Sequence, residues 1–151
     1  MRGIQELGFF KLARLGNPMR ALLPLALVVL AACDGGSGTM KPGQDCLSCH
    51  KPGGEKPWTL AGTVFPTATS VTNQGLSGAT VQITDANSAT VTLTSNSAGN
   101  FYTPNALAFP VAVAITHAGN TVNMNAAPSG ACNSCHSEPP LNGAPGRINV
   151  P

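Results

Sequence analysis

Four of the five cysteines in this chain of 151 residues fall into two copies of one short pattern. Residues 46–50 read C-L-S-C-H and residues 132–136 read C-N-S-C-H, so the two copies begin 86 positions apart. Thiolate sulfur and imidazole nitrogen are good ligands for borderline and soft metals, and paired cysteines also form disulfides in exported proteins. The pattern therefore predicts a disulfide framework, a zinc site or a chemistry in which each histidine has a defined role.

Cys-x-x-Cys-His resembles the haem attachment motif of c-type cytochromes, and it does so at both copies. The resemblance implies two covalent haem c (heme c) groups, because two thiols three positions apart can add to the two vinyl groups of one haem. It also implies that the histidine of each motif is the proximal iron ligand. The residues implied in cofactor binding are Cys46, Cys49, His50, Cys132, Cys135 and His136.

Two other interpretations of the motifs stay open. A zinc site built from the four motif cysteines has suitable ligand chemistry, but it leaves both histidines without a role. Disulfides are the stronger alternative, because exported thiols tend to oxidise. We expect haem first, disulfides second and zinc last.

The distal iron ligands are limited by a count. Two six-coordinate haems need four axial ligands, and the chain has three histidines, so two bis-histidine haems within one chain are excluded. The candidate distal ligands are Met124, His117 and Met40. About six antiparallel strands between the motifs would bring both motifs to one end and place Met124 near the second motif, whereas a seventh strand would favour His117.

The first 32 residues are predicted to be an export signal. A cationic start precedes an apolar stretch, residues 21–32, which ends in small residues. This stretch has only twelve residues and contains Pro24, so it is too short for an ordinary membrane span. Met19 would itself begin a complete signal, which leaves open whether translation starts at Met1 or at Met19.

The tetrapeptide L-A-A-C, residues 30–33, resembles the lipobox of bacterial lipoproteins. The resemblance implies a diacylglycerol on the sulfur of Cys33 and cleavage just before it. A plain secretory signal with an incidental cysteine is the alternative. After cleavage at Cys33, 119 residues remain, with four Lys/Arg against five Asp/Glu and hence a formal charge of −1.

Between the motifs, apolar residues alternate with Thr, Gln and Asn, which predicts β-strands separated by turns. Trp58 is expected to be the first core residue of the resulting fold. The expected fold class is mainly β: a small antiparallel Greek-key sandwich of about six or seven strands, flanked by irregular haem-bearing segments. The expected strands are 58–65, 79–84, 89–94, 99–103, 110–116 and 121–124.

Residues 60–120 resemble the carboxypeptidase regulatory-like, transthyretin-like sandwich domains. The matching pieces are A-G-T-V, G-L-S-G-A-T-V-Q-I, T-S-N-S-A-G-N-F and V-A-V-A-I-T-H-A-G. The resemblance implies a scaffold without a catalytic site, since a fold does not itself define a function.

The expected organisation has five parts, and the haem segments are too short to bury cores of their own. We therefore expect the haems to pack on the sandwich, on each other or on another subunit. The parts are a lipoprotein signal (1–32), the lipidated cysteine with a flexible tether (33–45), the first haem segment (46–57), the sandwich (58–125), and the second haem segment with a Pro-rich tail (126–151).

The function expected from these features is electron relay in the bacterial cell envelope, by a lipid-anchored dihaem cytochrome c on the periplasmic side of either membrane or on the cell surface. Redox proteins of the envelope are the expected partners, with haem-to-haem self-association as a further contact. Nucleic acid is excluded as a partner, because charged residues make up 9 % and aromatics 5 % without a basic run.

No nucleophile–base pair, carboxylate pair or phosphate loop predicts an enzyme. The alternatives to electron relay are a haem protein with an open coordination site, acting as a ligand sensor or peroxidase, and a disulfide-stabilised structural sandwich without haem.

Overall fold

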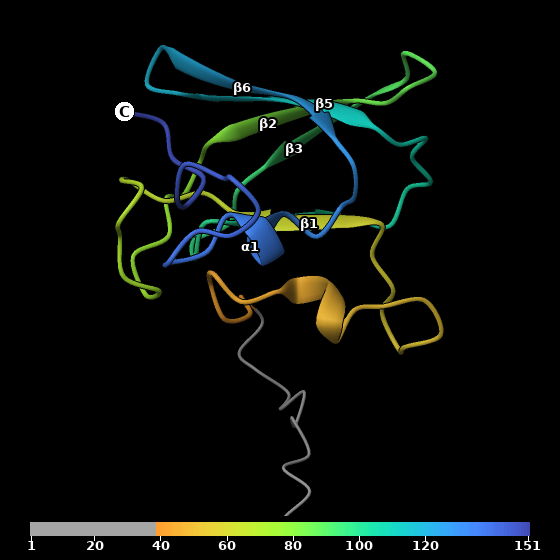
Figure 1. The fold of residues 1–151 in the computed structure, drawn as a ribbon, viewed down its shortest axis with the longest axis horizontal. Helices are drawn as coiled ribbons and strands as arrows, with labels where there is room; N and C mark the ends of the chain where they lie inside the picture. Colours follow the sequence, from red (N-terminus) through yellow and green to blue (C-terminus); the bar gives the residue numbers. More distant parts are fainter. Residues whose placement is uncertain (1–38) are drawn as a thin grey trace, which may run out of the picture. The chain divides into compact units, whose positions relative to one another are not determined.

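Two antiparallel β-sheets lie over each other in the computed structural model, which describes residues 39–151 (Figure 1). The described residues all belong to one compact unit. The strands are β1 (Leu60–Thr63), β2 (Thr80–Thr84), β3 (Thr90–Thr94), β4 (Asn100–Thr103), β5 (Val111–His117) and β6 (Asn120–Ala127).

The smaller sheet pairs β1 with β4, and the larger one has the order β3-β2-β5-β6. The pairs β1–β4 and β2–β5 are neighbours in space but not in sequence, as in Greek-key connections. The chain therefore crosses between the sheets after β1, after β3 and after β4. These crossings tie the two layers together.

The core lies between the sheets and follows the alternation of the strands. Val81 and Ile83 are fully buried while Thr80 and Gln82 between them are exposed, as expected for strands with one face on the core. The smaller sheet contributes Leu60 and Phe101 to the same cluster, and Val150 near the chain end joins it. The tail is thus part of the sandwich core.

The C-terminal segment extends the smaller sheet along the free edge of β1. Ala61 N donates to Gly130 O over 2.9 Å, and Phe65 N donates to Ile148 O over 2.7 Å. Parallel bridges join Ala61 to Ala131 and Phe65 to Asn149. The smaller sheet is therefore continued by the residues on either side of the second motif.

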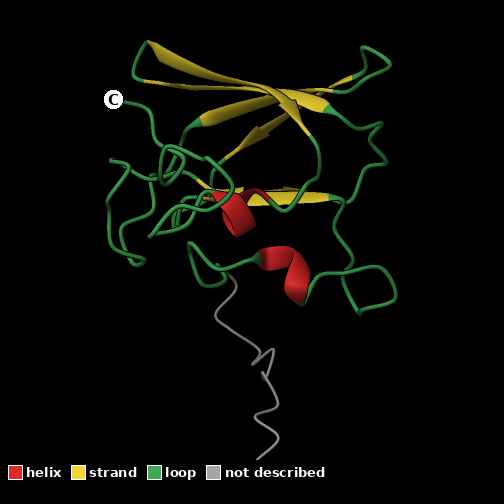
Figure 2. Ribbon diagram, viewed as in Figure 1, coloured by secondary structure: helices red, strands yellow, loops and turns green. Residues whose placement is uncertain are grey.

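The expected fold class is confirmed: six antiparallel strands form two sheets without closing into a barrel. All six expected strands are present, although β1 begins two residues later than predicted and β6 runs on to Ala127. Within the described range the only helices are two short ones, η1 (Cys46–Ser48) and α1 (Cys132–Cys135), drawn in red in Figure 2.

Candidate functional site: two cysteine motifs beside one cavity

Each Cys-x-x-Cys-His motif forms a single helical turn. The His50 N–H donates to Cys46 O over 2.9 Å, and the His136 N–H donates to Cys132 O over 3.0 Å. This closure places the first cysteine and the histidine of each motif on one side of the turn. The two motifs therefore have the same local backbone hydrogen bond, in η1 at the first and in α1 at the second.

The two motifs lie side by side, which confirms the expectation that the fold brings them together. Asn133, inside the second motif, donates to Gln44 O over 2.8 Å, and its Nδ2 lies 4.0 Å from Cys46 Sγ. Asn133 is 3 % exposed. A side chain of one motif thus contacts the backbone and the sulfur of the other motif's segment.

A buried polar network fastens this contact to the smaller sheet. Thr63 on β1 donates its N–H to Asn133 Oδ1 over 3.1 Å and its hydroxyl to Asn100 Oδ1 over 2.7 Å. Asn100 on β4 donates in turn to Thr39 O over 2.6 Å. Buried amides with all their partners fix one geometry, because each lost partner leaves an unsatisfied group.

Two glycines allow the second motif to approach β1. A Cβ on Gly62 would lie 2.9 Å from Cys132 Cβ and 2.7 Å from Phe101 Cζ, and a Cβ on Gly130 would lie 2.0 Å from Thr59 O. These separations are shorter than the contact distances between non-bonded atoms. Glycine at both positions is therefore required for Cys132 to rest on the sandwich.

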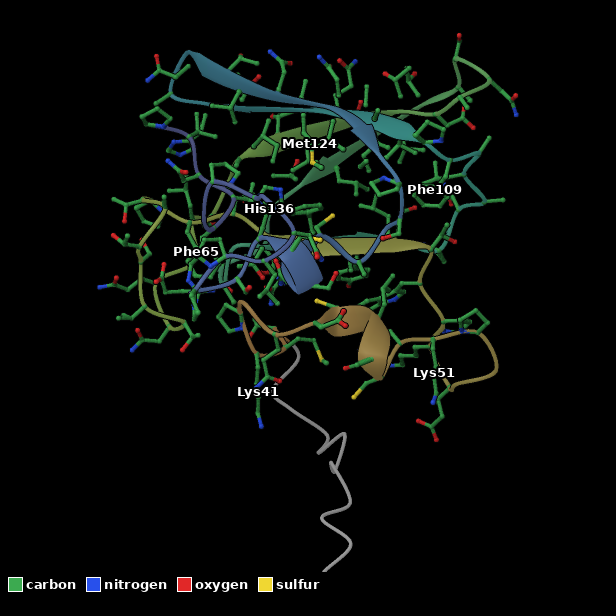
Figure 3. All side chains as sticks on the ribbon, viewed as in Figure 1. Lys41, Lys51, Phe65, Phe109, Met124 and His136 are labelled. Carbon is green, nitrogen blue, oxygen red and sulfur yellow. The ribbon has the colours of Figure 1, made fainter. Side chains whose placement is uncertain are left out.

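The second motif opens into a largely apolar cavity of about 210 Å³ between the larger sheet and the C-terminal segment. Cys132, Cys135 and His136 line it on one side, and Met124 on β6 lines it on the other. Figure 3 shows Met124 on the side of its sheet that faces α1 and His136. The cavity thus joins two thiols, an imidazole and a thioether.

Both motif histidines use Nδ1 for a backbone hydrogen bond. His136 Nδ1 lies 2.9 Å from Gly146 O, and His50 Nδ1 lies 2.8 Å from Lys56 O. A carbonyl oxygen only accepts, so Nδ1 carries the proton and Nε2 is the basic nitrogen. This tautomer is the one that metal-binding histidines adopt, with the second ring nitrogen held by a hydrogen bond.

The histidine of the first motif is covered by an aromatic side chain, whereas that of the second lines the cavity. The imidazole of His50 stacks on Trp58 with ring centroids 3.5 Å apart, and its Nε2 is buried without a hydrogen-bond partner. Trp58 stacks in turn on Tyr102 at 4.0 Å. The expectation that Trp58 is a core residue is wrong: it is half-buried and outside the core cluster, because it covers the histidine instead.

The motif sulfurs differ in state. Cys46, Cys132 and Cys135 are free thiols, whereas Cys49 is disulfide-bonded. Burial raises the pKa of Cys46 to about 11, with the nearby Asp45 carboxylate adding to the effect. Burial, and then the neighbouring Cys46 sulfur, raises the pKa of Cys132 to about 12. These two thiols are therefore protonated and weakly nucleophilic at neutral pH.

Of the three candidate distal ligands, only Met124 is among the described residues that line the cavity beside the second motif. Met124 is 39 % exposed and shares the cavity with His136. His117 ends β5 and is not among the residues that line the cavity. Met40 lies near Asn100, which contacts its backbone carbonyl over 3.4 Å, and it is not among the described residues that line the cavity.

Two residues of the site were not singled out from the sequence. Asn133 occupies a variable position of the motif, so no local signal marked it. Arg147 also lines the cavity, and it is the only arginine in residues 39–151. Charged residues are rare in this chain, so the single arginine in this range could have been singled out from the sequence.

Cys33 and the predicted export signal lie outside the described residues. Residues 39–151 contain no helix long and apolar enough to cross a membrane. In the same range, no three His, Cys, Asp or Glu side chains converge as a metal-binding group. Comparison of the chain with protein-family models, curated proteins and solved structures gave no match.

Proposed function

We propose that this chain is a dihaem c-type cytochrome that relays electrons at a bacterial envelope, anchored by lipid on Cys33. The observation that carries the proposal is the set of groups around one cavity: the free thiols of Cys132 and Cys135, the oriented imidazole of His136 and the thioether of Met124. Haem c supplies one-electron redox chemistry when it is bound.

The chain's own groups fit covalent haem at the second motif. Cys132 and Cys135 would hold the haem through two thioether bonds, each formed by net addition of S–H to a C=C bond, so that no oxidant would be consumed. Gly146 O holds the His136 ring with Nε2 free to bind iron. The cavity walls are mostly apolar, and Met124 would offer a soft thioether ligand, which favours a higher reduction potential than histidine does.

The first motif fits the same role after one chemical change. The disulfide at Cys49 must be reduced with two electrons from a thiol reductant before that sulfur can add to a vinyl group. The buried, unpartnered Nε2 of His50 supports a ligand role, because an orphaned buried acceptor is rare without a functional reason. Opening the first motif also requires movement around Trp58.

A structural sandwich without haem is the second candidate, and the disulfide at Cys49 is the observation that favours it. Three free thiols beside one another argue against it, because a disulfide scaffold in an oxidising compartment would pair them. A haem protein with an open coordination site is the third candidate. It would differ from the first only at the first motif, to which no distal ligand is assigned.

Optical spectroscopy of the purified protein separates these candidates. Electron relay predicts low-spin haem bands, an open site predicts high-spin bands, and a disulfide scaffold predicts no haem band. Cys135→Ala should leave the second haem poorly attached and the first intact, and the matched Cys49→Ala should do the reverse. Retention of both haems in both variants would contradict the assignment of the motifs.

A further inference from the structure

The loop that follows the first motif, residues 51–57, is hydrogen-bonded to the rest of the described structure only through His50. Within the loop, Gly54 N donates to Lys51 O over 3.0 Å and closes a turn. Toward the motif, Lys56 O lies 2.8 Å from His50 Nδ1. Figure 3 shows Lys51 pointing away from the sheets. Opening this loop therefore breaks no hydrogen bond within either sheet.

Trp58, directly after the loop, closes it over the motif histidine. Trp58 N donates to His50 O over 2.9 Å, and the two rings stack with centroids 3.5 Å apart and an angle of 13° between their planes. Trp58 also stacks on Tyr102 of β4, with centroids 4.0 Å apart. The His50 Nε2 atom is buried without a hydrogen-bond partner. The nitrogen that would have to bind iron is thus inaccessible while the loop is closed.

The histidine of the second motif has a different setting. His136 lines the cavity together with Cys132 and Cys135, and no aromatic ring of the described residues stacks on it. The two motifs share a sequence pattern and a backbone turn, so their main difference is what covers the imidazole. At the first motif that cover is Trp58 with its loop.

We propose that Trp58 and residues 51–57 form a lid over His50, and that this lid makes the second motif take up haem before the first. The inference rests on the proposed function. Iron binds imidazole at the nitrogen lone pair, so His50 would ligate a haem only after the lid has opened. Trp58 is thus a positioning residue, because it acts on the haem only through His50.

The lid is tested without haem, on the full chain, by the reaction of its histidines with diethyl pyrocarbonate at one fixed pH. This reagent acylates a free imidazole nitrogen, and peptide mass locates the product. In the wild type, His50 should react more slowly than His117 and His136. Trp58→Leu should raise the rate at His50 by roughly two- to tenfold, as expected for the loss of one aromatic stack. Trp58→Phe keeps a ring and should restore most of the protection.

The rates at His117 and His136 are the internal control for folding. If Trp58→Leu raises all three rates together, that variant has unfolded and the wild type decides alone. Equal reactivity of His50 and His136 in the wild type overturns the lid. An unchanged rate at His50 in a folded Trp58→Leu protein does so too.

The order is tested by adding limiting ferrous haem to the wild type and to Trp58→Leu. Excess dithiothreitol reduces the disulfide at Cys49 by two electrons, so that this bond cannot itself delay the first motif. Peptide mass should locate haem on the second motif first in the wild type, and on both motifs at similar rates in Trp58→Leu. Haem on the first motif first, or the same order in both proteins, overturns the proposal. Haem on neither motif counts against the proposed function, while the histidine reactions still decide whether the lid exists.

Discussion

At the scale of single residues, the two motif histidines form the same type of hydrogen bond, but their surroundings differ. Gly146 O and Lys56 O hold Nδ1 in each, yet His136 lines a cavity while His50 Nε2 is buried beside Trp58. The proposed cofactor would meet an imidazole that lines a cavity at the second motif, whereas the first motif would have to rearrange to receive one. The effects of single substitutions are therefore easiest to interpret at the second motif.

Met124 should be the distal ligand of the haem at the second motif. Met124→Ala should abolish or weaken the weak far-red absorption band that thioether–iron bonding gives in oxidised cytochromes, because Met124 is the candidate that shares a cavity with His136. His117→Ala and Met40→Ala are the controls and should leave that band alone. Loss of low-spin character on changing His117, with both methionine variants silent, would contradict the assignment.

The raised thiol pKa values predict a pH dependence that haem should remove. The pKa values of Cys46 and Cys132 rise from an ordinary 9.0 to about 11 and about 12 on folding, so folding favours the protonated thiols. Their contribution to stability is complete below pH 9 and is lost as the pH rises toward 12. Denaturant unfolding of the haem-free chain between pH 8 and 11 should show this decline.

In the haem-loaded protein the two sulfurs are thioethers without a proton, so this decline should be absent. Changing both cysteines to serine in the haem-free chain is the matched control and should flatten the same curve. An equal decline in loaded protein and in the serine variant would show that other groups cause it.

At the scale of elements, β1 is the support on which both motifs are assembled. Its one edge pairs with β4 and its other edge with the residues around the second motif. Thr63 and Gly62 on this strand contact Asn133 and Cys132 respectively. The spacing between η1 and α1 is thus set by β1, by the hydrogen bonds of Asn133 and by the absence of a side chain at Gly62.

Asn133→Ala should destabilise the protein by about 1–3 kcal/mol, because Thr63 N and Gln44 O lose buried partners. Denaturant unfolding measures this change. Asn125→Ala is the matched control: Asn125 is exposed on β6 and its side chain has no hydrogen-bond partner among the described residues, so about 0.5 kcal/mol or less is expected. Equal effects of the two substitutions would show that the network contributes nothing.

The strands were predictable from the sequence because their signal is local: Val81 and Ile83 alternate with polar residues, and the turns are marked by glycine and asparagine. The roles of Trp58 and Asn133 were not, because each depends on a partner brought from elsewhere by the fold. Trp58 meets Tyr102 from β4, and Asn133 meets Gln44, 89 residues earlier in the chain.

At the scale of the whole molecule, one sandwich carries two motif segments that are too short to bury cores of their own. Leu60 and Phe101 of the smaller sheet pack with Val150 of the tail in the same cluster, so the segment that carries the second motif and the scaffold share a core. Removing the tail should therefore unfold the scaffold and not only the site. The proposed electron relay would require both motifs to hold haem.

Anchoring is tested at Cys33. If a diacylglycerol is attached there, the wild type should partition into detergent, and Cys33→Ala should change processing and release the protein into the aqueous phase. Cys46→Ala is a matched control, because it removes a cysteine of the first motif and should leave partitioning unchanged. A soluble wild type cleaved elsewhere would contradict the lipobox interpretation.

The central claim, two covalent haems on one chain, is tested most directly by the intact mass of the denatured mature protein. The account predicts the mass of the 119-residue chain with its lipid plus two haems, and haem that stays with the polypeptide through a denaturing gel. A mass without haem that is reduced only by the hydrogens lost in disulfide formation would contradict it.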